Sequence, residues 1–231
     1  YEMREASEKD CRKLAEFAEE ILRQSYQVVA VRTEQYYRRM LAEQKSEHGG
    51  IGMIERNGKL VGSFFFAKEE TYEIREPLLK KGEEEALPQA VFWLTKGNEA
   101  IFCDGWNLDV HNIKKSVTEE RDRPLIMARL LYLPGFFESL RPRTTFSFTV
   151  EVTDPLLEEN NRRFLLESDG TKIAVSTAAK ENDTDRQISI AAMTQVLFGW
   201  EPYTEEKLSE ALQKDLNKIE PADGVFLNEI V

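Results

Sequence analysis

The chain has 231 residues, of which 41% are hydrophobic and 10% aromatic, enough for one large domain or two of ordinary size. Its formal net charge of -11 argues against a nucleic-acid backbone or an anionic membrane as a partner, because both would repel it. The charge is compatible with a cationic substrate, and an acidic surface also serves solubility alone.

Cysteine and histidine are scarce: the chain holds Cys11, Cys103, His48 and His111, with no CxxC spacing. These residues suggest neither a disulfide framework nor a metal-ligand cluster, so we predict no metal. No apolar run reaches the length of a membrane span and no signal peptide is present, so we predict a reducing, cytoplasmic compartment. The chain begins at Tyr1 rather than Met, and we expect it to be part of a longer protein.

The first half opens with two expected helices. Ser7, followed by acidic residues, predicts a helix over residues 8–23, with apolar side chains at helical spacing. Thr33 predicts the N-cap of a second helix, which should end near His48-Gly49-Gly50, since glycine commonly follows a helix.

A hairpin, a third helix and a strand follow. Two apolar runs flank Asn57-Gly58, which predicts a hairpin over residues 51–66 with a type I′ turn. We expect a helix over residues 83–96, with Pro88 in its first turn, and then a buried strand over residues 100–104.

The spacing Glu47-x-x-Gly50-x-Gly52 resembles a glycine loop that holds the pyrophosphate of coenzyme A. Such a loop needs free backbone N–H groups between the end of a strand and the start of a helix. These glycines follow an expected helix and precede an expected hairpin, so we interpret the segment as a turn.

Residues 107–122 are polar without a strong period, and we expect the domain boundary there. A strand over residues 124–133 and a short helix near residues 136–140 should follow. Residues 145–153 alternate apolar and polar side chains, which predicts a half-buried strand.

The rest of the second half predicts a hairpin over residues 164–176, a short strand over 188–190 and a helix over 191–198. Thr204 should cap a further helix through Leu216. We therefore predict an α+β half, with its strands in one sheet that helices cover on one face.

The chain stays apolar to its end, through Val225, Phe226, Leu227, Ile230 and Val231. We predict that this end is buried and that desolvation raises the pKa of the Val231 α-carboxylate from roughly 3.5. A carboxylate in that position can accept a proton near neutral pH. The alternative is a terminal strand that pairs at a sheet edge and does no chemistry.

Short motifs occur in a fixed order along the chain: Tyr26-Gln27-Val28 to Arg32, Gly49-Gly50-Ile51, Ile74-Arg75-Glu76-Pro77, Ile126-Met127-Ala128-Arg129, Val152-Thr153-Asp154-Pro155 with Asn160, Leu197-Phe198-Gly199, and Val225 to Val231. Together they resemble the Eis-like (enhanced intracellular survival) N-acetyltransferases of the GCN5-related (GNAT) superfamily. That family has an acetyltransferase domain, a second acetyltransferase-like domain and a domain resembling sterol carrier protein 2.

The resemblance implies that residues 1–118 form the second GNAT-like domain, without an acetyl-CoA loop, and that residues 119–231 form the sterol carrier protein 2-like α+β domain. Acetyl-CoA would bind to the N-terminal GNAT domain, which this chain does not include. The C-terminal carboxylate of Val231 would reach that domain as the general base. Glu229 would help to attract a cationic amine. The best-studied members end on an aromatic residue, so we expect a different pocket shape near Val231.

The implied activity is acetyl transfer from acetyl-CoA to primary amines, on multi-amine compounds such as aminoglycosides or on lysine side chains. The implied partners are the N-terminal GNAT domain and further copies of the chain in a homo-oligomer, without nucleic acid or membrane. Two alternatives stay open. One is a sterol-carrier-like module that binds a lipid under the apolar face of Met193, Val196, Leu197 and Phe198. The other is a non-catalytic scaffold for an oligomer.

This division predicts that the 231 residues alone neither bind acetyl-CoA tightly nor turn it over, because the cofactor loop lies in another domain. Isothermal titration calorimetry with acetyl-CoA measures this directly. Measurable binding would place a cofactor site within these residues.

Overall fold

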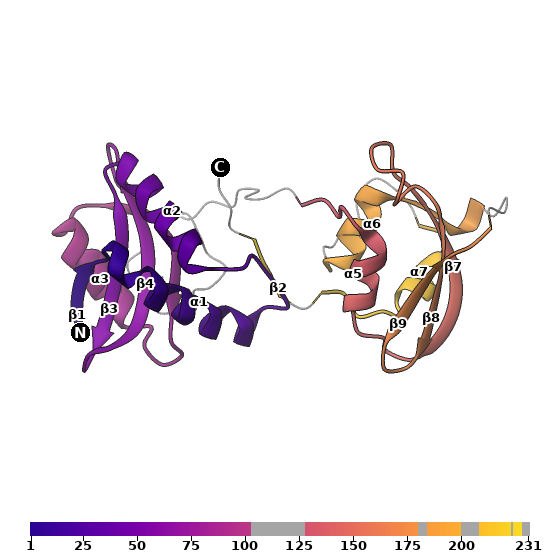
Figure 1. Ribbon diagram of the computed structural model, residues 1–231, viewed down its shortest axis with the longest axis horizontal. Helices are drawn as coiled ribbons and strands as arrows, with labels where there is room; N and C mark the ends of the chain where they lie inside the picture. The colour runs from indigo at the N-terminus through magenta and orange to yellow at the C-terminus, as the bar shows by residue number, and fades with distance from the viewer. Residues whose placement is uncertain (103–127, 180–183, 200–207, 223, 228–231) are drawn as a thin grey trace. The chain divides into compact units, whose positions relative to one another are not determined.

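The computed structural model describes residues 1–102, 128–179, 184–199, 208–222 and 224–227. They belong to two compact units, one comprising Tyr1–Leu125 with Phe226–Val231 and the other Ile126–Val225. Figure 1 shows both units.

The first unit is built on a mixed five-stranded sheet in the order β1-β3-β4-β5-β6. Its strands are β1 (Glu2–Glu5), β3 (Gly50–Arg56), β4 (Lys59–Lys68), β5 (Tyr72–Leu79) and β6 (Ala100–Phe102). Neighbouring strands are antiparallel except β5 and β6, which run parallel.

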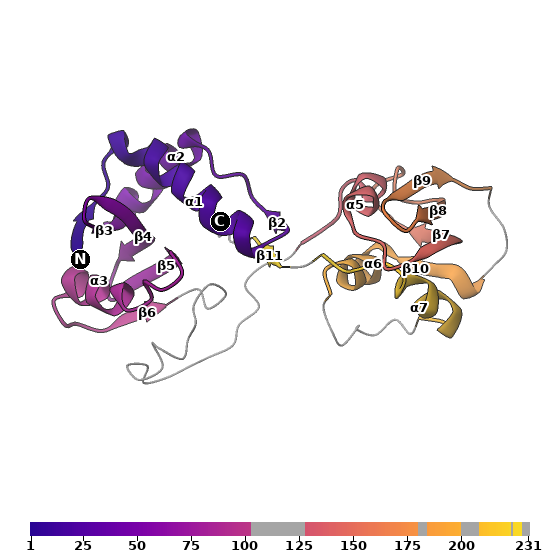
Figure 2. The ribbon, with the colours of Figure 1, turned by 90° about the horizontal axis from the view of Figure 1, so that it is seen from below.

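Helices cover both faces of this sheet. Helices α1 (Cys11–Ser25) and α2 (Glu34–Ser46) lie on one face, and α3 (Ala86–Thr95) lies on the other (Figure 2). Alternate residues of one strand serve the two cores: in β4, Phe65 packs with α1 and α2, whereas Phe64 and Phe66 pack with α3. This alternation follows from the two-residue period of a strand and gives three layers.

The starts of α1 and α2 and the turn between β3 and β4 lie where the local sequence predicted them. The Asp10 carboxylate accepts hydrogen bonds from the Ser7 N–H (2.8 Å) and hydroxyl (2.7 Å), so α1 begins through the short 3₁₀ helix Glu8–Asp10. The Thr33 hydroxyl accepts the Tyr36 N–H of α2 at 3.1 Å. Asn57 and Gly58 have φ values of 52° and 74°, which confirms the type I′ turn.

Three strands were not predicted from the sequence: β1, β5 and the two-residue strand β2 (Val28–Val29). β5 is hard to recognise because charged residues interrupt it and Glu76 has a left-handed φ of 46°. Its pairing with β4 shifts register there, between Ser63 and Phe65, as at a β-bulge. The bulge breaks the alternation that marks a strand in the sequence.

Two details of the first half are corrected. The expected buried strand after α3 is the edge strand β6, and Ile101 is 52% exposed because nothing described pairs on that side. The residue that turns left-handed after α2 is His48 (φ 55°), not a glycine. Gly49 is required by a close approach, because a Cβ there would lie 1.9 Å from the Phe66 carbonyl oxygen.

The second unit has a four-stranded sheet in the order β10-β7-β8-β9. Its elements are β7 (Thr145–Thr153), β8 (Arg163–Asp169), β9 (Ile173–Thr177), β10 (Gln187–Ser189), α5 (Leu133–Ser139), α6 (Ile190–Leu197) and α7 (Glu210–Leu216). The predicted alternation of β7 is confirmed, since Phe146, Phe148, Val150 and Val152 are buried. The opposite face of β7 is more exposed, so the packed core lies on one side of the sheet.

Two predicted elements of this unit are wrong. Residues 128–132 are not a strand, and the chain enters α5 at Leu133; residues 124–127 lie outside the described residues. The Leu130 and Leu131 carbonyls accept hydrogen bonds from the Asn160 side chain instead of a neighbouring strand. The last helix is capped by Ser209, whose hydroxyl accepts the Leu212 N–H at 3.1 Å, while Thr204 lies outside the description.

The expected boundary between residues 118 and 119 also lies outside the described residues. At the other end, the division differs from the expected one. Phe226 was expected in the second domain, but its 2%-exposed ring is part of the α1–α2 core of the first unit.

Asn160 is the polar centre of the second unit. Its buried side chain accepts the Leu133 N–H at 3.0 Å and donates to the Leu130 carbonyl (3.2 Å) and the Asp154 carboxylate (3.1 Å). Burial alone would raise the pKa of Asp154. The Leu156 N–H, the Asn160 amide, the Leu157 N–H and Arg129 outweigh burial and hold the pKa below its ordinary value. One amide and one carboxylate thus fix the irregular segment that enters α5.

Asn160→Ala should lower the free energy of unfolding by about 3 kcal/mol, because it leaves buried donors and acceptors without partners. Urea unfolding followed by circular dichroism measures the loss, and amide exchange at Leu133 assigns it to the second unit. Exposed Glu159→Ala is the control and should change little. Equal effects of the two substitutions would contradict the central role of Asn160.

Candidate functional site

Val231, predicted as the general base, and Glu229, predicted to bind the substrate, lie outside the described residues. Their roles therefore stay predictions. The structure describes how the chain approaches them. The last strand, β11 (Val225–Phe226), forms a two-stranded sheet with β2. Pairing of the terminal strand, expected under the alternative without chemistry, is thus present at Phe226.

Phe226 is held by aromatic and cationic neighbours. Its ring centroid lies 5.2 Å from that of Tyr26, with the planes tilted by 39°. The Arg32 guanidinium carbon lies 5.9 Å from the Phe226 ring centroid, within the range of a cation–π contact. We call Tyr26, Arg32, Tyr36, Glu76 and Phe226 the C-terminal anchor.

A buried ion pair lies at the centre of the anchor. Arg32 Nη2 is 2.9 Å from Glu76 Oε2, and both side chains are only 1% exposed. Arg32 also donates to the Tyr36 hydroxyl, and its guanidinium carbon lies 4.4 Å from the Tyr36 ring centroid. Each charge is therefore compensated within the core, as a buried charge must be.

Local backbone geometry brings the two charges together. Arg32 directly precedes Thr33, the residue that caps α2, so the start of that helix fixes its position. Glu76 lies at the β5 bulge with its left-handed φ of 46°. A non-glycine residue in that conformation is uncommon and costs roughly 1–3 kcal/mol, so the surrounding structure has to enforce it.

Tyr37 lies close to this pair but is unsuited to proton transfer. Burial, with a smaller contribution from the Glu76 carboxylate, raises the pKa of the Tyr37 phenol well above its ordinary value, and Arg32 opposes the shift. Its hydroxyl makes no hydrogen bond among the described residues. An efficient acid or base needs a pKa near the operating pH, so the Tyr37 phenol is a poor candidate for that role.

The glycine spacing near residue 50 does not fit a pyrophosphate. Gly50 and Gly52 belong to β3 and pair with β4, so the expected turn is a strand. A Cβ at Gly52 would lie 2.3 Å from the Phe64 ring, and one at Gly50 would lie 3.1 Å from the Phe66 ring. These glycines make room for aromatic side chains of the core, not for a ligand.

Across the described ranges, no three His, Cys, Asp or Glu side chains come together as a metal site. In the same part of the chain, no helix is long and apolar enough to cross a membrane.

Comparison with known proteins identifies the second half. Residues 133–230 match the family described as sterol carrier protein domain. The chain carries a sterol carrier protein domain. The match reaches residue 230, although Phe226 packs in the first unit. No curated protein matches the chain by sequence.

Solved structures identify the fold of the whole chain. It is similar to a probable N-acyltransferase from Enterococcus faecalis (TM-score 0.71, 15% identity, covering 97% of this chain and 62% of that one). It is also similar to a GCN5-related N-acetyltransferase from Kribbella flavida, with a TM-score of 0.62 and 14% identity over 100% of this chain and 60% of that one. A GCN5-related N-acetyltransferase from Anabaena variabilis is similar too, with a TM-score of 0.61 and 13% identity over 97% of this chain and 61% of that one.

These identities establish the fold alone. The chain is thus a mixed α/β protein resembling GNAT acetyltransferases, with a sterol carrier protein domain at residues 133–230. It spans about three fifths of the length of each of these three structures.

The sterol carrier protein domain has a small described cavity of about 170 Å³, lined partly by Val196, Leu197 and Ile219. Ligand pockets usually measure roughly 300–1,000 Å³. Met193 and Leu197, on the face considered for a lipid, are buried in the core, and Phe198 packs on Phe136 with ring centroids 5.2 Å apart. These described side chains of the face considered for a lipid are therefore packed into the core.

Glu76→Gln should lower the free energy of unfolding by about 3–5 kcal/mol, because it leaves Arg32 charged and buried without a counter-ion. It should also speed amide exchange at Phe226, which the pair helps to hold. Urea unfolding and hydrogen exchange measure the two effects.

Glu73→Gln on the same strand is the matched control. Glu73 pairs with Arg75 at 2.7 Å, but its side chain is 39% exposed, so its loss should cost at most about 1 kcal/mol. If both variants lost the same stability, the buried pair would not be the centre of the anchor.

Proposed function

We propose that this chain is the C-terminal portion of an Eis-like, acetyl-CoA-dependent N-acetyltransferase that acts on primary amines, and that the Val231 carboxylate is its general base. The supporting observation is the C-terminal anchor. Phe226 is fixed in the core of the acetyltransferase-like unit, five residues before the end of the chain. Five extended residues reach at most roughly 17 Å, so the anchor confines the terminal carboxylate to a limited region.

In this proposal, the carboxylate accepts a proton from the substrate ammonium group and leaves a neutral amine with a free electron pair. Acetyl-CoA would supply the acetyl group that the amine attacks, and it would bind to a GNAT domain N-terminal to Tyr1. A main-chain carboxylate has the same chemistry whichever side chain its residue carries, so valine can serve where relatives have an aromatic residue. Glu229 and the net charge of -11 would favour a cationic, multi-amine substrate or a lysine side chain.

The proposal includes an N-terminal GNAT domain of the same protein as partner, assembly into a homo-oligomer and a cytoplasmic location. The lipid-carrier alternative is less favoured, because the described cavity in the sterol carrier protein domain is smaller than usual ligand pockets. A non-catalytic scaffold remains the competing function, and the following experiment separates it from the proposal.

In the full-length protein, replacing the terminal carboxylate by an amide through intein-mediated ligation should lower kcat by about 100-fold or more, with KM changed less. The acidic limb of the pH–rate profile should disappear with it, because the titrating base is gone. Steady-state kinetics with a multi-amine substrate across a pH series measures both effects.

Val231→Phe is the control, because it keeps the carboxylate and should retain kcat within a few-fold. Deletion of Val231 moves the carboxylate back by roughly 3.5 Å and should also be inactive. Unchanged kcat in the amidated enzyme would remove the carboxylate from the mechanism.

A further inference from the structure

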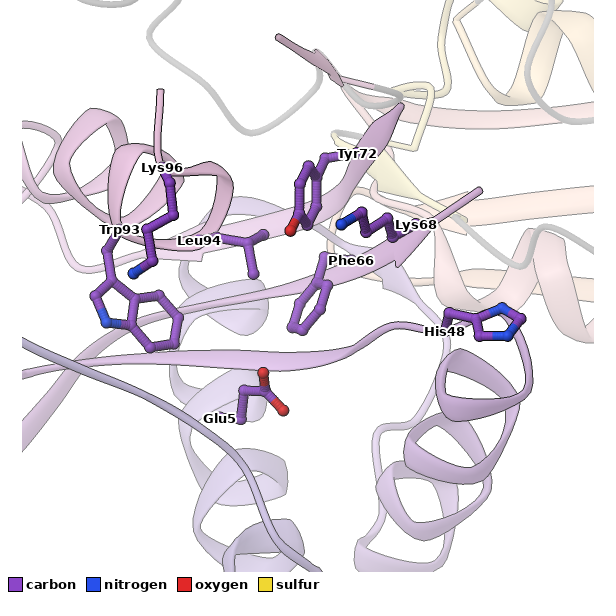
Figure 3. A pocket seen from close by; sticks show the side chains of 8 residues that line it. All are labelled: Glu5, His48, Phe66, Lys68, Tyr72, Trp93, Leu94 and Lys96. Atoms are coloured by element: carbon purple, nitrogen blue, oxygen red, sulfur yellow. The ribbon is translucent and has the colours of Figure 1, made fainter. Parts of the chain in front are cut away.

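We propose that the first unit contains a binding pocket for a small organic anion, a carboxylate or phosphate monoester carried on a flat apolar body. The pocket has a volume of about 240 Å³ and lies where the ends of β4, β5 and α3 meet. Its walls include Phe66, Lys68, Tyr72, Trp93 and Lys96, which Figure 3 shows. Such an anion would be a ligand in addition to the substrates of the proposed acetyl transfer.

Two lysines supply the positive charge of the pocket. The Lys68 ammonium nitrogen lies 4.8 Å from the Tyr72 ring centroid, and that of Lys96 lies 5.5 Å from the Trp93 ring centroid. Cation–π contact thus holds each ammonium group against an aromatic wall. Both charges are placed before any ligand arrives, which lowers the entropy cost of binding.

Neither lysine has an ion-pair partner among the described residues. This contrasts with Arg75 on β5, which binds both Glu47 and Glu73 at 2.7 Å. The chain has 42 acidic and 31 basic residues, so carboxylates are abundant. Two lysines that line one pocket with a single carboxylate, Glu5, can each give charge-assisted hydrogen bonds to an anion.

The backbone at Lys96 supports a built site. Lys96 ends α3 in a left-handed conformation, with φ 55° and ψ 32°. Gly97, the next residue, is also left-handed, with a φ of 86°. Figure 3 shows the Lys96 side chain directed from the end of α3 toward the Trp93 indole. Non-glycine residues in such conformations are enriched at ligand sites.

The remaining lining residues narrow the ligand class. Glu5 from β1 also lines the pocket, so the two lysines leave an excess of one positive charge when His48 is neutral. This balance favours one compact anionic head group, a carboxylate or a phosphate monoester, over a polyanion. The rings of Phe66, Tyr72 and Trp93 favour a flat apolar body. The cavity is smaller than pockets for drug-sized molecules, which limits the ligand to a small molecule.

The test uses the 231-residue chain and phenyl phosphate, with benzoate as the carboxylate probe and benzylamine as the probe of opposite charge. Calorimetry should show saturable binding of both anions, weakening as salt rises, and none of benzylamine. NMR shifts on titration should cluster at Lys68, Tyr72 and Lys96. Inorganic phosphate alone should bind more weakly than phenyl phosphate, because it lacks the flat body.

The double variant Lys68→Gln/Lys96→Gln should weaken phenyl phosphate binding by about tenfold or more. Glu5→Gln should strengthen it several-fold by removing a like charge. Lys59→Gln/Lys172→Gln changes the same number of exposed charges away from the pocket and should leave affinity unchanged, and circular dichroism confirms folding of each variant. Absence of saturable binding, unchanged affinity in the Lys68/Lys96 variant, or equal binding of benzylamine would overturn the proposal.

Discussion

The ion pair between Arg32 and Glu76 is the constraint on which the path of the chain end depends. Both charges are buried between the sheet and the α1–α2 layer, where neither is stable without the other. Glu76 enters the pair from a left-handed position at the bulge in β5. The pair also leaves the Arg32 guanidinium close to the Phe226 ring. One buried ion pair therefore connects the bulge of β5 with the last described residues of the chain.

Sequence family and packing divide this chain differently. The sterol carrier protein domain extends to residue 230 by sequence, but Phe226 is part of the core of the first unit. An apolar ring follows the core that buries it best, and Tyr26 with the α1–α2 layer provides that core.

In the second unit, which matches a sterol carrier protein domain, Met193 and Leu197 of the face considered for a lipid are buried in the core. The unit's specific feature is polar: Asn160 binds the backbone where a regular strand was expected, and Asp154 accepts a hydrogen bond from the Asn160 amide. A shared fold thus does not carry its ligand with it, and function has to be argued from the site.

The sequence by itself determined the elements whose signals are local. Asn57-Gly58 specified the hairpin, Thr33 the start of α2, and the alternation of residues 145–153 the half-buried β7, because turn chemistry, capping and periodicity act between near neighbours. It also indicated that the apolar chain end is buried, as Phe226 is, while Val231 and Glu229 stay predictions. Only the tertiary structure decided that Glu76 and Arg32 are core residues, that residues 128–132 are irregular and that β6 is an edge. Each of these three features depends on a contact with a segment that is distant in the sequence. A charged side chain is expected to be exposed unless a buried counter-charge is known, and the sequence does not identify that counter-charge.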